Sequence, residues 1–203
     1  LIQNSDLDLV IGNYYYDIDN KRVSYIANTD YWTCLIKAEL GCTPSNLWRK
    51  DTIKKLGGWD NVKSSQENFL RVKFLKDDAK IIIDNEFNCL VRKINSNSIS
   101  SSNISDNLKR SIDLRIEIYE YLKAKNLISV ENKEATNSFV FDLILAYYKY
   151  EKKESNYYYQ TFYKPNFKLI RSKLNVGFYY LLKIFGFNYA MMISLFLKRT
   201  IRA

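Results

Sequence analysis

The residues able to carry chemistry in this 203-residue chain are limited first by what the chain lacks. It contains no histidine, which removes the usual general base near neutral pH and any Ser-His or Cys-His nucleophile. Its three cysteines, Cys34, Cys42 and Cys89, are scattered and form no C-x-x-C pair, so a structural zinc site is not expected. They are interpreted as buried thiols in a reducing compartment. Acid–base chemistry must therefore come from carboxylates, lysine, tyrosine or cysteine.

Two Asp-x-Asp strings have the composition of a metal site but not its position. Asp6-Leu7-Asp8 precedes its expected strand, whereas a metal-binding Asp-x-Asp belongs at the carboxyl end of a strand. Asp17-Ile18-Asp19 follows a strand, but the Asn and Lys after it are typical of an exposed hairpin turn. Both strings are interpreted as structural, and no metal ligand is assigned in this chain.

The elements that must position any site begin with a small α/β pattern. Residues 7–16 and 21–27 are rich in β-forming residues and predict a hairpin. Asp51 is placed to cap a short helix that runs to Leu56, with Gly57 as its left-handed stop. Further short strands are expected near residues 43–49, 80–83 and 89–92.

The middle of the chain changes from strands to helices. Ser64-Ser65-Gln66-Glu67 matches a capping box, in which a Ser and a Glu three residues later satisfy each other's backbone amides. It predicts a buried helix from about Ser65 to Lys76. Residues 95–105 form a polar linker, and the apolar spacing beyond it predicts helices over 106–125 and 131–153.

The basic character of the chain is confined to its last quarter. Residues 1–154 carry all 22 acids and 23 of the 31 Lys and Arg, whereas residues 155–203 carry eight cations and no acid. This asymmetry indicates an anionic partner. Nucleic acid is not expected, because the cations alternate with aliphatic pairs and no recognised module is present.

The longest uncharged stretch, Ile184 to Leu197, has fourteen residues, fewer than the ~20 needed to span a bilayer. With its aromatic residues and flanking cations it fits an interfacial helix on an anionic membrane surface. The alternative is an ordinary packing helix with a basic, solvated end.

The most specific pattern lies between Gly41 and Arg71. It contains a Leu-Trp-Arg strand end at 47–49, a Gly-Gly-Trp-Asp loop at 57–60 and a Ser-Gln-Glu helix start at 65–67. This order and spacing resembles family 2 glycosyltransferases. Residues 8–17 resemble the strand and hairpin after that family's metal motif, and Arg92 with Ser98-Ile99-Ser100 resembles the segment that closes its catalytic domain. The resemblance covers residues 6–102, about half of the chain.

The resemblance implies an α/β fold of the GT-A type, whose first half binds a nucleotide-sugar donor and whose second half binds the acceptor. Residues 1–104 would then be the acceptor-side half, and residues 105–203 a helical C-terminal extension that can associate with a membrane. Members of the family are typically inverting. A carboxylate deprotonates the acceptor hydroxyl, and a divalent metal, Mn or Mg, stabilises the departing diphosphate. The donor half and its metal motif are expected to lie outside this chain.

Glu67 occupies the position of the family's catalytic base, although the family more often has Asp there. A structural role is the alternative. At the third position of a capping box Glu67 would reach the Ser64 amide, and Arg71 at i+4 offers it an ion pair. The surrounding Gly-Gly-Trp-Asp and Ser-Gln context favours the base.

The other candidate residues surround this position. Trp59 and Asp60 are assigned to acceptor binding, because aromatic faces suit sugar rings and a carboxylate can hold a hydroxyl; a packed structural loop is the equal alternative. Lys73 stands where the family often has Arg, and it is expected to pair within the fold. Arg49 and Arg92 either face the diphosphate or stabilise strand ends.

The function implied by the resemblance is inverting transfer of a sugar from a nucleotide-sugar to a hydroxyl of a glycan or lipid-linked acceptor. The expected setting is bacterial surface polysaccharide or glycan biosynthesis, in the cytoplasm at the inner face of the cell membrane. The alternative is a non-catalytic protein, either a glycosyltransferase remnant or a membrane-associating module that binds glycan.

Overall fold

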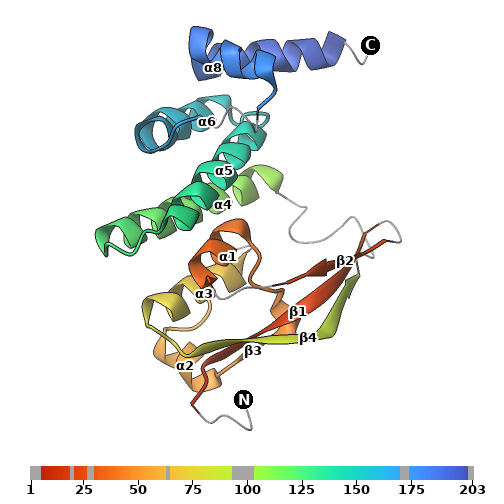
Figure 1. Cartoon of the computed structure of the whole chain (residues 1–203), viewed down its shortest axis with the longest axis vertical. Helices are drawn as coiled ribbons and strands as arrows, with labels where there is room; N and C mark the ends of the chain where they lie inside the picture. The colour runs from red at the N-terminus through yellow and green to blue at the C-terminus, as the bar shows by residue number, and fades with distance from the viewer. Residues whose placement is uncertain are drawn as a thin grey trace.

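The computed structural model describes residues 6–18, 21–26, 30–62, 65–92, 103–169 and 174–200. A small sheet lies at one end of the molecule, and successive layers of helices are stacked away from it (Figure 1). The mixed α/β class expected from the sequence is confirmed. The elements of the sheet half are β1 (Leu9–Ile18), β2 (Lys21–Tyr25), α1 (Tyr31–Lys37), η1 (Thr43–Ser45), β3 (Asn46–Trp48), α2 (Lys50–Lys55), α3 (Gln66–Lys76) and β4 (Ile81–Arg92).

β1 is the central strand of the sheet. It pairs antiparallel with β2 near its end and with β3 near its start, which confirms the predicted hairpin. β4 pairs with it in parallel, from Leu9 opposite Ile81 to Asp17 opposite Arg92. Because β4 bonds to the same β1 residues as β2 and β3 do, those two strands must share the other edge of β1.

The prediction of two separate strands at 80–83 and 89–92 is wrong, because β4 is continuous. The register shifts on either side of Asn13, so that Gly12 is opposite Asp84 and Asn13 is opposite Phe87. The polar residues between them are accommodated as a bulge, and the Asn13 side chain donates to the Asn85 carbonyl at 3.1 Å. Asn85 and Glu86, whose composition is typical of a turn, therefore lie inside a continuous strand.

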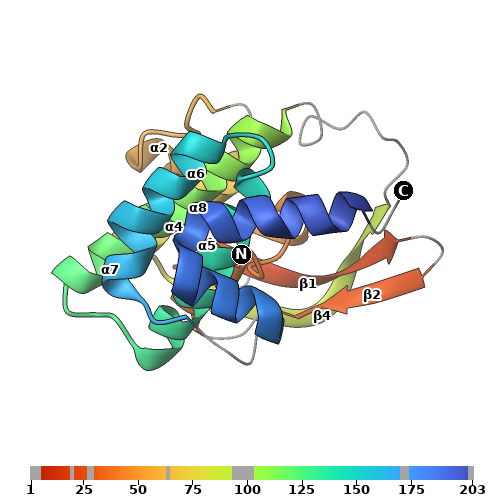
Figure 2. The same cartoon turned by 90° about the horizontal axis from the view of Figure 1, so that it is seen from above.

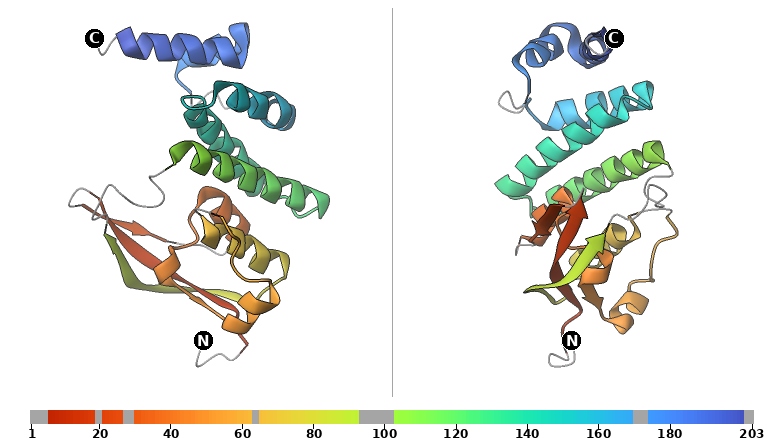
Figure 3. Two further views of the ribbon diagram at one scale, coloured as in Figure 1. Left: turned by 180° about the vertical axis from the view of Figure 1, so that it is seen from behind. Right: turned by 90° about the vertical axis from the view of Figure 1, so that its right-hand side faces the viewer.

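Helix starts also differ from expectation. α2 begins with Arg49 as its N-cap, so Asp51 lies in the first turn rather than at the cap. Gly57 has a φ of 80° directly after the helix, as predicted. α1 and α3 pack over the sheet (Figure 3), and together they bury a first core cluster. Its fully buried members include Leu9, Ile11, Leu35, Ile36, Leu70 and Phe74.

The second half consists of helices: α4 (Ile104–Ala124), α5 (Val130–Tyr147), α6 (Lys152–Tyr158), the π-helical turn η3 (Tyr159–Tyr163), α7 (Lys164–Asn166) and α8 (Val176–Thr200). α4 confirms the predicted helix at 106–125 and starts beside the expected domain boundary at 104. α4 and α5 contribute residues to both core clusters, because one face of each packs toward α1 and the other toward the C-terminal helices. Most of the predicted linker, residues 95–105, lies outside the described residues.

The prediction of one helix over 131–153 is wrong, because the chain turns after Tyr147 and starts again at Lys152. Ser155 donates to the Ile144 carbonyl at 2.7 Å and holds α6 back against α5. This return lets Tyr158, Tyr159 and other aromatic residues join the second core cluster. Burying these aromatic side chains stabilises the fold more than continuing α5 as an exposed helix would.

α8 is long and apolar. Its residues Val176–Leu197, with a mean hydropathy of 1.5, are sufficient in length and composition to cross a membrane. The helix is bent, however, because Gly186 has φ 73° and ψ 175°, a conformation essentially restricted to glycine. Seen from above, the two arms diverge from this bend over α5 (Figure 2). They are arm 1, residues 176–185, and arm 2, residues 187–200.

Candidate functional site

Glu67 lies in the first turn of α3. The N-cap of α3 is Ser65, which has a φ of 60° and makes no side-chain capping bond. Glu67 is therefore the second helical residue rather than the third, and the predicted capping box is wrong. The unpaired amides at a helix N-terminus favour a carboxylate in its anionic form. Gln66, the preceding residue, donates to the carbonyl of Val62, two residues after the Gly-Gly-Trp-Asp loop, at 2.7 Å.

The predicted ion pair between Glu67 and Arg71 is not formed, since none of the ion pairs among the described residues involves Glu67. Arg71 is instead buried, with 3% of its surface exposed. It donates to Asn68 Oδ1 at 2.6 Å and to the Gly41 carbonyl at 3.3 Å. Burial lowers the pKa of the Arg71 guanidinium to about 10, and the negative charge of Glu67 opposes this shift. Arg71 is thus a buried cation that acts on Glu67 through space.

Trp48 links the strand, the helix and the loop. Its ring meets Trp59 edge-on with centroids 5.7 Å apart and Phe74 at 5.4 Å. The Arg71 guanidinium lies 5.8 Å from the Trp48 ring centroid. Trp59 is 42% exposed, so one part of its ring packs while the rest faces solvent. The loop therefore presents a fixed aromatic surface.

Lys73 fastens this loop to α3. Its ammonium donates to the Gly58 carbonyl at 3.1 Å and to Asp60 Oδ1 at 2.7 Å, which confirms the pairing predicted for it. Gly57 and Gly58 have φ values of 80° and 76°, which favour glycine and allow the chain to turn sharply here. Asp60 is positioned by this bond, and its assignment to acceptor binding stays a prediction.

Arg49 and Arg92 lie at opposite ends of the sheet. Arg49 is beside the start of β1, where its Nε donates to the Leu7 carbonyl and lies 4.0 Å from Asp8. Arg92 is exposed and opposite Asp17 at the other end. Eight residues of strand separate these ends by about 26 Å, so one diphosphate cannot contact both. The contacts of Arg49 favour its alternative role of stabilising a strand end.

The first Asp-x-Asp string is engaged in the fold, as expected. Asp6 pairs with Lys80 at 2.8 Å, and Asp8 accepts bonds from the Thr52 hydroxyl and the Lys80 amide. Within the described ranges, no three His, Cys, Asp or Glu side chains are grouped as a metal site requires. Asp19 of the second string and Ser98–Ser100 of the closing segment lie outside those ranges.

The sequence did not reveal that two cysteines meet. The sulfur atoms of Cys42 and Cys89 are 3.9 Å apart, and all three cysteines are free thiols. Burial, followed by the neighbouring Cys42, raises the pKa of Cys89. The contact depends on the parallel pairing of β4, which spacing along the chain does not show.

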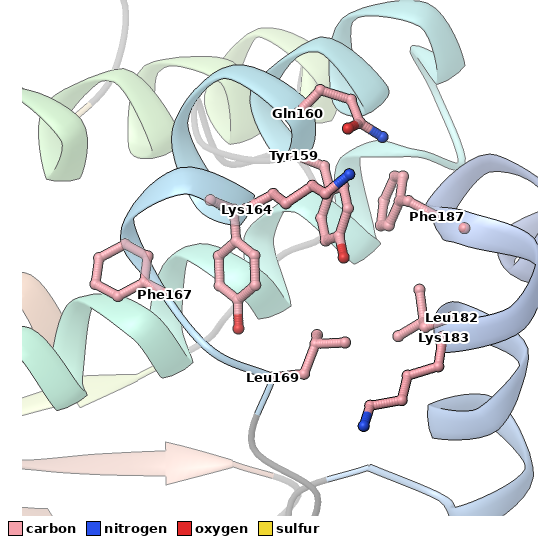
Figure 4. Close-up of a pocket in the computed structure, with 10 residues that line it drawn as sticks. Tyr159, Gln160, Lys164, Phe167, Leu169, Leu182, Lys183 and Phe187 are labelled. Atoms are coloured by element: carbon pink, nitrogen blue, oxygen red, sulfur yellow. The ribbon is translucent and has the colours of Figure 1, made fainter.

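A second candidate region surrounds the bend of α8. A cavity of about 340 Å³ lies between η3, α7 and α8 (Figure 4). The rings of Tyr159 and Phe187 stack there with centroids 4.3 Å apart. Lys164 and Lys183 come from opposite walls of the cavity (Figure 4). This aromatic stack fixes the bend to the rest of the protein.

α8 also carries apolar residues on its outer surface. Four aromatic or apolar side chains, each more than half exposed, are called here the outer stripe: Phe185 at the end of arm 1, and Tyr189, Met192 and Phe196 at helical spacing along arm 2. The opposite face of arm 2 is buried through Phe187, Ala190 and Met191. Arm 2 is therefore apolar on its exposed face as well as on its buried face.

Comparison with known proteins identifies no relative: no protein-family model, no curated protein and no solved structure matches the chain. A functional assignment therefore depends on the residues and the geometry described above.

Proposed function

We propose that the chain is the acceptor-side half of an inverting glycosyltransferase of the family 2, GT-A type, with Glu67 as its catalytic base. The observation that carries this proposal is the setting of Glu67. Glu67 lies in the first turn of α3 and has no direct ion-pair partner among the described residues. The start of α3 follows the loop that presents the half-exposed Trp59. The order of motifs around it supports the same assignment.

The proposed chemistry needs a base because a hydroxyl is a weak nucleophile until its proton is shared. Glu67 accepts the proton of the acceptor hydroxyl, whose oxygen attacks the anomeric carbon as the bond to the diphosphate breaks. The buried Arg71 guanidinium lies close enough to Glu67 for their charges to interact, and the helix N-terminus favours a negatively charged side chain in its first turn.

The acceptor would stack on the exposed part of Trp59, whose position is fixed by Trp48 and by the bond of Lys73 to Gly58 and Asp60. A divalent metal, Mn or Mg, would neutralise the leaving diphosphate of the nucleotide-sugar. The described residues do not offer a set of ligands for it, and neither the base nor the acceptor step described here depends on it.

The test is sugar transfer by the full-length polypeptide that carries these residues, assayed with a panel of nucleotide-sugars. Glu67→Gln should lower kcat by about 10²–10⁴-fold and leave the KM for the donor unchanged. Glu134→Gln, which neutralises an exposed acid on α5, serves as the matched control and should keep full activity. Full activity of Glu67→Gln would contradict the role of the base. Absence of donor turnover in the parent protein would favour the glycan-binding alternative.

A second proposal concerns location: α8 lies on an anionic membrane surface at the inner face of the cell membrane. It is supported by the outer stripe and by the lack of any acid after residue 154. Arm 1 and arm 2 are about 15 Å and 21 Å long, each shorter than the ~30 Å hydrocarbon core. The bent helix therefore fits the interface better than a full span.

Co-sedimentation with vesicles tests this location. The protein should bind phosphatidylglycerol vesicles and bind phosphatidylcholine vesicles at least ten-fold more weakly. Phe185→Ser combined with Phe196→Ser should abolish binding, since both side chains belong to the outer stripe. Equal binding of that variant would exclude α8 as the membrane contact.

A further inference from the structure

A larger groove lies between the two arms of α8, with α5 as its floor. Its volume is about 600 Å³, within the range of small-molecule pockets. The floor is formed by α5 and the turn that follows it, since the lining residues 142, 145, 146 and 149 are spaced i, i+3, i+4 and i+7. Leu145 and Ala146 lie at its centre. Phe178 and Leu181 of arm 1 and Met191 and Leu195 of arm 2 form the walls. The middle of the groove is therefore apolar.

The bend at Gly186 creates this groove. Its backbone conformation turns arm 2 away from the line of arm 1, and the arms diverge over α5 (Figure 2). Tyr148 holds the bend in place, because its hydroxyl donates to Asn188 Oδ1 at 2.5 Å and its ring meets Phe187 edge-on. The groove is thus part of the folded architecture.

The groove is continuous with the surface proposed to meet the membrane. Leu197 lines the groove and is itself half exposed, one residue beyond Phe196 of the outer stripe. Polar groups lie among the other lining residues: Lys149 in the turn after α5, the Asn175 amide and the Ser194 hydroxyl. Asp142 also lines it and has an interaction of its own.

We propose that this groove binds one acyl chain of an anionic phospholipid taken from the membrane on which α8 lies. The inference rests on the proposed membrane association. The apolar middle of the groove fits a hydrocarbon chain, whose burial away from water favours binding. The lining carries one acid, Asp142, beside the cation of Lys149, so the excess positive charge that complements an anionic headgroup comes from the acid-free stretch 155–203. The lipid would anchor the bent helix beyond what surface contact alone supplies.

The test separates the groove from the membrane surface. Lauroyl-lysophosphatidylglycerol, kept below its critical micelle concentration, is titrated into the protein by calorimetry. One molecule should bind per chain, and the phosphatidylcholine counterpart should bind at least five-fold more weakly. Ala146→Phe, which fills the floor of the groove, should weaken binding at least ten-fold. Ala124→Phe, at an exposed alanine of α4, is the matched control and should bind normally.

A second filling variant, Ser194→Phe, narrows the groove from arm 2 and should reproduce the loss if Ala146→Phe fails to fold. The outer-stripe variant Phe185→Ser with Phe196→Ser should lose vesicle binding and keep the monomeric lipid. Vesicle binding without lipid uptake would overturn the groove proposal and leave the membrane location standing. A dimer in light scattering that Ala146→Phe dissociates would also overturn it, because a second copy would then occupy the groove.

Discussion

The sheet half and the C-terminal helices of this protein differ in the kind of contact that positions their exposed side chains. In the sheet half, ion pairs and hydrogen bonds position polar groups: Lys73 donates to the Asp60 carboxylate, and Arg71 donates to the Gly41 carbonyl. In the C-terminal half, stacked rings position an apolar surface, as Tyr159 does for Phe187 at the bend of α8. The first arrangement suits chemistry on a hydroxyl, and the second suits attachment to a surface.

The two halves meet through polar contacts on α1. Arg115 of α4 is buried and donates to the Ile36 carbonyl at 3.1 Å, while Asn132 of α5 donates to the Thr33 hydroxyl at 2.8 Å. Burial lowers the pKa of Arg115 to about 10, and its guanidinium lies 4.9 Å from the Phe139 ring. Such directional contacts fix how α4 and α5 sit on the sheet half, so the two surfaces keep a set orientation.

The largest effect is expected when one buried phenylalanine ring is removed from each of the two core clusters. Phe187→Ala and Phe74→Ala should each lower the free energy of unfolding by about 3–5 kcal/mol, because both side chains are fully buried. Since α4 and α5 belong to both clusters, each variant should shift one shared transition in urea, followed by far- and near-ultraviolet circular dichroism. Two separate transitions would show that the halves fold independently.

The next largest effect is expected at the bend. Gly186→Ala should lower stability by about 1–3 kcal/mol, because φ 73° with ψ 175° strains any residue with a Cβ. Gly177→Ala in arm 1 is the control: its φ is ordinary and its added methyl group would meet only the Asn175 amide oxygen, at 3.3 Å, so stability should change by no more than about 0.5 kcal/mol. Thermal unfolding measures both. Equal losses of stability in the two variants would mean that the bend does not require the backbone conformation of Gly186.

Alkaline pH should weaken the helical half through Tyr158. Burial, followed by its hydrogen bond to Asp113, raises the pKa of Tyr158 to about 12. Because the folded pKa lies above the ordinary value near 10, this contribution is complete below pH 10 and is lost as pH rises through 12. Tyr158→Phe should cost about 1–2 kcal/mol at neutral pH and flatten the decline of stability between these values.

Urea unfolding at pH 8, 10 and 11 follows the change, and Tyr150→Phe, at an exposed tyrosine, is the control. If Tyr158→Phe keeps the full pH slope of the parent protein, the hydroxyl does not link α6 to α4.

The smallest changes in stability are expected from substituting two lysines of the sheet half. Lys73→Met should lower stability by about 1 kcal/mol, because it leaves Asp60 and the Gly58 carbonyl without their partner. Lys55→Met removes a more exposed ion pair, with Asp77 at 2.6 Å, and should change stability by less than about 0.5 kcal/mol. Fluorescence of Trp59 should shift only in Lys73→Met, and a shift in both would contradict the specific link to the loop.

Local signals predicted much of this fold. The hairpin, α3 and α4 follow from β-forming runs and apolar spacing, because each is decided within a few residues. The bulge in β4 and the turn after Tyr147 were missed, since tertiary contacts such as Asn13 with Asn85 and Ser155 with Ile144 decide them. The bend at Gly186 was also missed, because a lone glycine in an apolar run does not specify its own φ.

For the candidate site, the sequence indicated which residues lie near Glu67 better than it indicated which atoms they contact. Lys73 pairs as expected, whereas Arg71, expected to offer Glu67 an ion pair, is buried and pairs elsewhere. An arginine at i+4 from a glutamate predicts an ion pair only if both remain on the surface. Here the Gly41 carbonyl and the Trp48 ring draw the guanidinium inward.

The parallel pairing of β1 with β4 has a consequence for the order of folding. Asn13 and Asn85, which meet in that pairing, are 72 residues apart along the chain, whereas α5 and α6 follow one another directly. Closing so long a loop is slow compared with helix–helix contact. We therefore expect α5 and α6 to pack together before β4 pairs with β1. The contact of Cys89 with Cys42, which depends on that pairing, would then form after these helices have packed.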